Sequence, residues 1–244
     1  MPFTFSHPAI VLPGYYFPKK WRSLTGLIVG SVTPDFEMFL RMEAKNAFSH
    51  SWHSIFWFNL PLAIVLAFLF HLAVRNPLID HLPAFLRQRL LPFKSFDWSG
   101  YFKRHYGIIV LSIIVGAASH IFWDSFTHAY GIFIRWFPAL AQKVSVGNFT
   151  MPLFSFLQFA FSALGALIIL YAILKLPRQK DFQQNINGFK YWSWVAVITI
   201  SLTALRLASG LDVSYYPNII VVIISAGLLG LMISPLLLNN QNSQ

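Results

Sequence analysis

The sequence predicts an all-α, polytopic integral membrane helix bundle with about five transmembrane helices, and three observations support this. Of the 244 residues, 56% are hydrophobic and only 11% are charged, whereas roughly a quarter of the residues in soluble domains are charged. The mean hydropathy is +0.59. Four apolar stretches each reach the ~20 residues that a helix needs to cross a bilayer: 54–74, 153–174, 191–211 and 217–238.

A fifth span is expected at 106–123, where IIVLSIIVGAASHIF ends in polar residues. A shorter apolar helix, Leu24–Val32, stops before Pro34, because proline disfavours helix at the residue before it. At ~1.5 Å per residue this helix covers about half of the ~30 Å hydrocarbon core. We therefore expect it to be re-entrant or packed on the bundle, with a short tilted span as the alternative.

The chain is expected to form a single membrane domain. Residues 1–53 make an N-terminal segment that carries motif residues, 54–238 the transmembrane bundle, and 239–244 a polar tail. Cysteine is absent, so any metal site must use histidine and carboxylate ligands.

Basic residues set the expected orientation. Lysines and arginines gather in the connections 75–105 and 175–190, which the positive-inside rule assigns to the cytoplasm. Residues 124–152 then face the extracytoplasmic side. The net charge of +10 comes from bases between apolar runs, a placement that favours membrane lipid rather than nucleic acid as the partner.

Ionisable residues at the ends of membrane spans are costly and therefore suggest function. In HIFWDSFTH, His120, Asp124 and His128 stand four residues apart, so at ~100° per residue they share one helix face. Imidazole and carboxylate are ligands that zinc accepts when no thiol is present. The alternative is a polar stripe that is hydrogen-bonded within the bundle.

Two further clusters should lie at the same face of the membrane. Asp35 and Glu37 follow the helix-stopping proline in GSVTPDFEMFL, and His50 and His53 precede the first long span in SHSWHS. His7, in FTFSHPA, joins them only if the N-terminal segment folds back; otherwise it is an ordinary interfacial histidine.

The segments FSHPA, GSVTPDFEMFLR, HSWHSIFWFNLPLA and HIFWDSFTH resemble an uncharacterised family of bacterial membrane proteins. That family is similar to predicted membrane-bound metal-dependent hydrolases and, more remotely, to zinc-dependent phospholipase C. The resemblance covers most of the chain and implies a multi-pass protein of the bacterial cytoplasmic membrane.

By motif order, the resemblance implies one or two divalent ions, expected to be zinc. Asp35, His50, His120 and Asp124 would hold one ion, and Asp124 would bridge toward a second near His7 and His128. The phospholipase pattern continues with another His and a Glu, which this chain lacks after His128 and Glu43. A third ion is therefore not expected.

The expected function is hydrolysis of a phosphoester in a lipid or lipid-linked substrate, with the site at the extracytoplasmic face. Asp35 and Glu37 are the candidate catalytic carboxylates, and Glu37 would act as a general base or orient a neighbouring ligand. Two other functions stay open: a transporter or channel that uses the His/Asp cluster as a binding site, and a protein in which a bound metal is purely structural.

Overall fold

The computed structural model describes residues 3–180 and 188–239. Within them, five helices are long and apolar enough to cross a membrane, which confirms the predicted class: Ile55–His81, Trp98–Trp136, Leu153–Lys175, Gly188–Ala208 and Tyr216–Leu238. Residues 240–244 of the expected polar tail lie outside the described residues.

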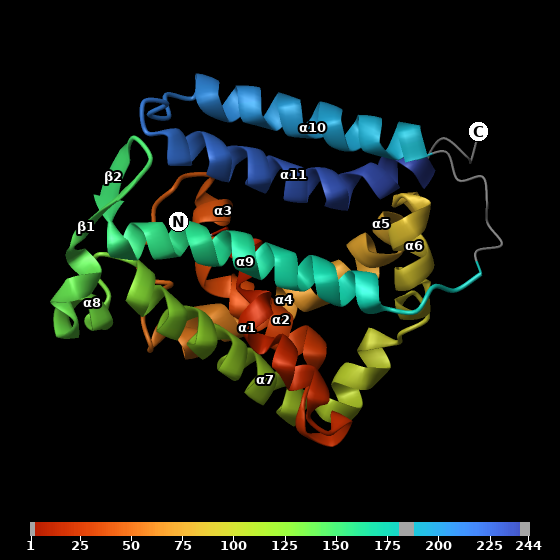
Figure 1. Ribbon diagram of the computed structural model, residues 1–244. Helices are drawn as coiled ribbons and strands as arrows, with labels where there is room; N and C mark the ends of the chain where they lie inside the picture. The colour runs from red at the N-terminus through yellow and green to blue at the C-terminus, as the bar shows by residue number, and fades with distance from the viewer. Residues whose placement is uncertain (1–2, 181–187, 240–244) are drawn as a thin grey trace. The chain divides into compact units, whose positions relative to one another are not determined.

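The helices of Figure 1 are α1 (Pro8–Val11), α2 (Leu24–Val32), α3 (Phe36–Arg41), α4 (Leu60–Leu69), α5 (Arg75–His81), α6 (Ala84–Leu90), α7 (Trp98–Thr127), α8 (Ile132–Trp136), α9 (Leu153–Lys175), α10 (Gly188–Ala208) and α11 (Tyr216–Asn239). The strands are β1 (Lys143–Val146) and β2 (Phe149–Pro152).

The chain divides into two compact units. The first comprises Met1–Asp35, Phe48–Ile64 and His105–Ala172, and the second comprises Phe36–Ala47, Val65–Arg104 and Ile173–Gln244.

In the first unit, α2 packs directly on α7. A Cβ added at Gly30 would lie 2.3 Å from the Ile113 carbonyl oxygen, and one added at Gly116 would lie 2.4 Å from the Leu27 carbonyl oxygen. The two backbones therefore touch where side chains are missing, which is how small residues bring membrane helices together. This contact fixes the end of α2 against the middle of α7.

The first long span begins with a π-helical turn, Ile55–Asn59, just before Pro61. Proline has no N–H and its ring clashes with the carbonyl four residues earlier, so a widened turn accommodates it. A second π turn, Phe70–Val74, likewise precedes Pro77. The first turn directs the buried Asn59 toward the loop that carries His50.

The connection between α8 and α9 contains an antiparallel hairpin that hydropathy does not reveal. Lys143 pairs with Pro152, and Val146 pairs with Phe149 across a tight turn. The turn is supported by Gly147, whose φ of 59° lies in the left-handed region that glycine adopts readily.

In the second unit, α10 and α11 run side by side (Figure 1). α11 also packs on α3, where Met38, Phe39 and Val221 form a buried core. α10 lies three residues nearer the N-terminus than the expected span 191–211.

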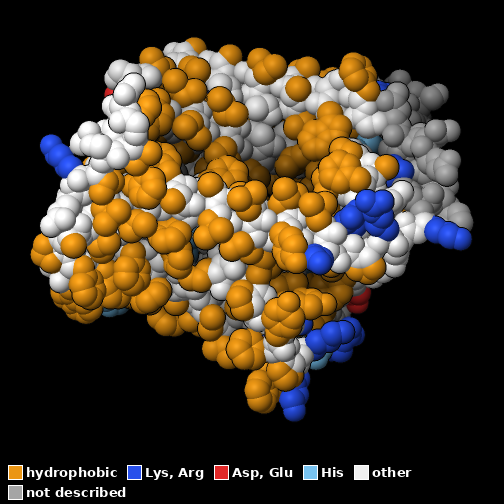
Figure 2. All heavy atoms as spheres, in the orientation of Figure 1, with side chains coloured by type: hydrophobic (Ala, Val, Ile, Leu, Met, Phe, Trp, Pro, Cys, Tyr) orange, Lys and Arg blue, Asp and Glu red, His pale blue; other side chains and the backbone are white. Residues whose placement is uncertain are grey.

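The surfaces of the long helices are apolar. Figure 2 shows hydrophobic side chains over much of α9, and lysines and arginines gathered near α6. Phe159, Leu167 and Leu170 of α9 are more than two-fifths exposed. Large side chains of this kind, exposed along a helix of membrane-spanning length, are suited to contact lipid tails.

Candidate metal centre

The N-terminal segment folds back onto α9. The Phe3 backbone N–H donates to Ser162 Oγ at 2.9 Å, and Ser6 Oγ donates to the Ser162 carbonyl oxygen at 2.7 Å. This anchoring places His7, which is buried, beside α7, with its Nε2 3.3 Å from Asp124 Oδ1. The fold-back on which His7 depended is therefore present.

Asp35 comes from the turn that ends α2. Pro34 has no N–H to continue the helical pattern, and the chain passes through the 3-10 turn Thr33–Asp35. The carboxylate is buried, and Thr4 Oγ1 donates to its Oδ2 at 2.5 Å. One oxygen of Asp35 is thus held by the N-terminal segment, and the other, Oδ1, faces the neighbouring histidines.

A tightly hydrogen-bonded loop carries His50. Ser54 Oγ donates to the Ser49 carbonyl oxygen at 2.7 Å, and Asn59 Nδ2 donates to the same oxygen at 3.0 Å. His50 Nδ1 lies 3.1 Å from Ser49 Oγ, so its Nε2 points away from the loop.

α7 supplies His120 and Asp124 from successive turns. His120 Nδ1 lies 2.7 Å from the Ser31 carbonyl oxygen. A carbonyl can only accept, so Nδ1 carries the hydrogen and Nε2 presents either a lone pair or a second proton to the cluster. The close packing of α2 on α7 therefore sets the tautomer of a site histidine.

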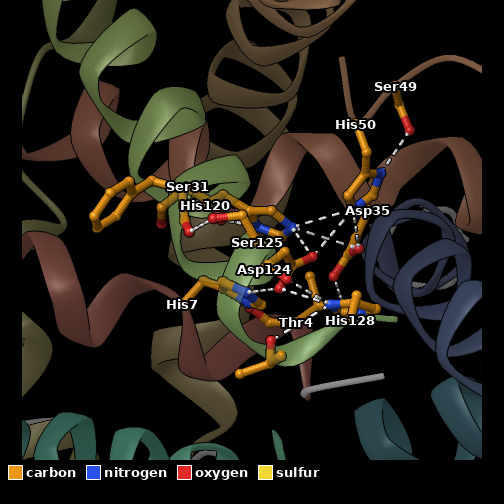
Figure 3. Close-up of polar contacts among 12 residues, drawn as sticks. Thr4, His7, Ser31, Asp35, Ser49, His50, His120, Asp124, Ser125 and His128 are labelled. Atoms are coloured by element: carbon orange, nitrogen blue, oxygen red, sulfur yellow. Dashed lines mark hydrogen bonds and ion pairs between the residues drawn. The ribbon is translucent and has the colours of Figure 1, made fainter. Parts of the chain in front are cut away.

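Four side chains converge on one point (Figure 3). His50 Nε2 lies 3.2 Å from Asp35 Oδ1, 3.4 Å from Asp124 Oδ2 and 3.3 Å from His120 Nε2. His120 Nε2 lies 3.3 Å from Asp124 Oδ2 and 3.6 Å from Asp35 Oδ1.

These spacings fit a four-coordinate ion. Ligands about 2.0–2.2 Å from a tetrahedral ion are separated by about 3.3–3.6 Å, and the five atom pairs above are 3.2–3.6 Å apart. The remaining pair of ligand atoms, one from each carboxylate, falls within the 4.8 Å that contains the whole group. Buried Asp35, His120 and Asp124, together with half-buried His50, could therefore hold a metal ion.

His7 and His128 lie beside this group rather than in it. The His7 ring stacks on the His120 ring with centroids 3.8 Å apart. His128 Nδ1 lies 3.2 Å from the Asp124 carbonyl oxygen, and the Gln158 side-chain amide lies 3.1 Å from His128 Nε2. Asp124 directs Oδ2 toward His50 and His120 and Oδ1 toward His7. Both ring nitrogens of His128 have protein partners, which does not favour a second ion beside it.

The other two candidates, Glu37 and His53, are not among these four side chains. Glu37, in α3 of the second unit, accepts hydrogen bonds at Oε1 from Arg41 Nε and from the Ala47 backbone N–H, both at 2.9 Å. These contacts close the loop after α3. His53 is exposed. The sequence does not indicate that Thr4, Ser31 and Gln158 orient the site, because their partners are distant in sequence.

The protonation of His50 and that of Asp35 depend on each other. Burial opposes a charge on His50, but the carboxylates of Asp124 and Asp35 outweigh it and raise the pKa of His50 to about 9. Burial would raise the pKa of Asp35, but the His120 and His50 imidazoles lower it to about 2. The Asp35 carboxylate thus stays charged and attracts positive charge, either protons on the imidazoles or a metal ion.

A pocket of about 160 Å³ opens beside the cluster and reaches His50 and Asp124. Its other lining residues are Trp52, Ile121, Ser125, Tyr130, Gly131 and Ile132. The cluster is therefore accessible from one side.

Fold and site together define a multi-pass membrane protein with a buried Asp/His group that could hold a metal ion. The chain belongs to the family described as a domain of unknown function, DUF4184, whose model matches residues 1–236. Comparisons with curated proteins and with solved structures give no match.

Proposed function

We propose that the protein is a membrane-bound, metal-dependent hydrolase that acts on a phosphoester. The observation that carries this proposal is the convergence of Asp35 Oδ1, His50 Nε2, His120 Nε2 and Asp124 Oδ2, for which five of the six pair distances are 3.2–3.6 Å. A donor set of two imidazoles and two carboxylates without thiolate suits zinc among the common divalent ions.

A divalent ion bound there would supply Lewis acidity, lowering the pKa of a water and neutralising charge on a phosphoryl oxygen. The side chains of the cluster would hold it in place. Ser31 and Thr4 keep His120 and Asp35 turned toward it, as hydrogen-bonded outer residues do in metal sites.

His7 supplies a proton carrier beside the four-ligand group. Its Nδ1 donates to the Thr4 carbonyl oxygen, and its Nε2 faces Asp124 Oδ1. Burial opposes protonation, but Asp124 and Asp35 outweigh it and raise the pKa of His7. His7 can therefore hold a proton at Nε2 within reach of the site. Glu37, whose Oε1 accepts hydrogen bonds from Arg41 and Ala47, is assigned no step.

A second candidate function is a purely structural metal site, and one observation favours it. Four protein ligands complete a tetrahedral shell, as in structural zinc sites, whereas catalytic sites keep one position open. The pocket that reaches His50 and Asp124 favours the hydrolase instead, since it gives a substrate a path to the cluster.

The substrate class and location follow from the membrane setting. The basic connections favour a cytoplasmic position for 75–105 and 175–190, so the end of α7 with its cluster is assigned to the extracytoplasmic face. A phosphoester within a lipid or lipid-linked molecule is the substrate available to a pocket at that level.

The test combines metal analysis of detergent-purified protein with a phosphodiesterase and phospholipid screen. His50→Ala should lose both bound metal and hydrolysis, because one of four ligands is removed. His53→Ala is the matched control, an exposed histidine three residues away, and should match the unmodified protein in both measurements.

Each alternative function predicts a different experimental result. Metal content unchanged in His50→Ala and in Asp124→Ala would refute the metal site. Metal that is retained without turnover would favour the structural role. Metal flux into liposomes without hydrolysis would assign transport.

A further inference from the structure

The pocket beside the cluster is small. At about 160 Å³ it falls below the roughly 300–1,000 Å³ of pockets that enclose whole small molecules. It has room for a phosphoryl group and its nearest atoms, so most of a lipid phosphoester must lie outside it. What surrounds the opening then decides which esters bind.

The opening is bordered by large apolar side chains. Trp52, Tyr130 and Ile132 line the pocket and are 56%, 58% and 48% exposed. These three residues are called the rim below. Tyr130 is held beside the site, because its ring lies 5.2 Å from the His128 ring, centroid to centroid.

The surface next to the rim in sequence is also apolar. Trp136, the last residue of α8, and Phe137 after it are 63% and 54% exposed, and Phe149 of the hairpin is 73% exposed. Aromatic side chains gather at the headgroup level of a membrane, where one edge of the ring is wet and the rest is apolar. The long helix α7 ends at Thr127, and these aromatic residues follow it in the chain. These aromatic side chains favour a pocket that opens at the level where lipid phosphates lie.

We infer that Trp52, Tyr130 and Ile132 form a binding rim for an alkyl group next to the phosphoryl group, so that the site selects amphiphilic phosphoesters presented at the bilayer interface. The inference rests on the proposed function and names its substrate class. The phosphoryl group occupies the pocket against His50 and Asp124, the first methylenes lie on the rim, and the rest of the tail stays in the membrane.

The reaction to be measured is hydrolysis of ethyl, hexyl and decyl p-nitrophenyl phosphates. The oxygen of water forms a bond to phosphorus, the bond between phosphorus and the p-nitrophenyl oxygen breaks, and p-nitrophenol leaves with a proton. The experiment uses the full-length, zinc-loaded protein in nanodiscs, where zinc content is measured first in each variant to confirm an intact site.

The decyl ester should have a higher kcat/KM than the ethyl ester in the unmodified protein. Trp52→Ala and Ile132→Ser should each lower the decyl-to-ethyl ratio about tenfold, the factor expected when part of an apolar contact is lost. Phe159→Ala is the matched control, because Phe159 is 54% exposed on α9 and does not line this pocket. Partitioning of the esters into the bilayer is the same for all variants, so it cancels from the comparison.

Binding of ethyl-, hexyl- and decylphosphonate, measured by calorimetry, separates this inference from the proposed function. In one outcome no ester is hydrolysed, but phosphonate affinity rises with chain length and Trp52→Ala weakens that rise. This result would support the binding rim and refute the hydrolase function. If esters are hydrolysed at a decyl-to-ethyl ratio that the rim variants leave unchanged, the hydrolase stands and the rim is refuted. If chain length and rim variants affect neither binding nor hydrolysis, the rim is refuted as well.

Discussion

At the scale of single residues, backbone carbonyls decide how the histidines present themselves. His120 donates from Nδ1 to Ser31, and His7 donates from Nδ1 to Thr4, so each turns Nε2 toward the carboxylates. The sequence indicates which residues are candidate ligands through their i, i+4 spacing. It does not indicate these carbonyl partners, because they lie on other segments.

Removing the donor to Asp35 should weaken the site without removing a ligand. Thr4→Val deletes the hydroxyl that donates to Asp35 Oδ2, and loss of such an outer partner typically lowers metal affinity about 10- to 100-fold. Chelator competition measures the effect. Thr150→Val, at an exposed hairpin position, is the control, and equal affinities in the two variants would contradict a role for Thr4.

The stability of the metal-free protein should depend on pH through His50. Its folded-state pKa, about 9, lies above the ordinary value of about 6.5. Its contribution is therefore fully present below about pH 6.5 and is lost as the pH rises through about 9. Asp35, whose pKa is lowered to about 2, contributes stability that is lost only as the pH falls toward that value.

Thermal unfolding in the presence of a chelator, from neutral to alkaline pH, checks this dependence. The melting temperature should fall through the alkaline range in the unmodified protein and fall less in His50→Gln. A melting temperature that rises with pH in the chelated protein would contradict the assigned protonation.

At the scale of elements, hydropathy predicted the five spans, and a proline predicted the end of the short helix Leu24–Val32. Hydropathy could not predict which residues of distant segments contact one another. The hairpin at Lys143–Pro152 alternates polar and apolar residues around Gly147 and Asn148, but its strands of four residues are too short for a hydropathy average to detect. The return of the N-terminal segment depends on Ser162, more than 150 residues away. Gln158 pairs with His128, a partner that only the packing of α9 reveals.

The contact between α2 and α7 should tolerate no added side chain at its centre. Gly30→Ala places a methyl group 2.3 Å from the Ile113 carbonyl oxygen, so the helices must separate, at a cost of about 1–3 kcal/mol. Because Ser31 and Asp35 follow on the same segment, metal content should fall as well.

Gly107→Ala is the matched control, since a Cβ at that position of α7 meets nothing within 4 Å. It should leave metal content unchanged and keep or slightly raise the melting temperature, because alanine favours helix over glycine. Equal melting temperatures for the two alanine variants would contradict direct backbone packing at Gly30.

At the scale of the whole molecule, the distribution of charge predicts orientation. The absence of cysteine allows single cysteines to report it without background. In intact cells, a membrane-impermeant thiol reagent should label Ser145→Cys on the hairpin and should label Ser95→Cys only after the membrane is opened. Both positions are exposed. Labelling of position 95 alone in intact cells would show that the orientation is the opposite of the predicted one and that the cluster lies at the cytoplasmic face.

The backbone contact between α2 and α7 also limits which residues related sequences can carry at Gly30 and Gly116. A packed isoleucine can be exchanged for leucine or valine with local adjustment. Gly30 and Gly116, in contrast, contact backbone carbonyl oxygens so closely that an added Cβ would lie 2.3 Å and 2.4 Å from them. Among members of this family that keep the histidines and aspartates of the cluster, these two glycines should therefore vary less than the isoleucines around them, and loss of the glycines should accompany loss of the cluster.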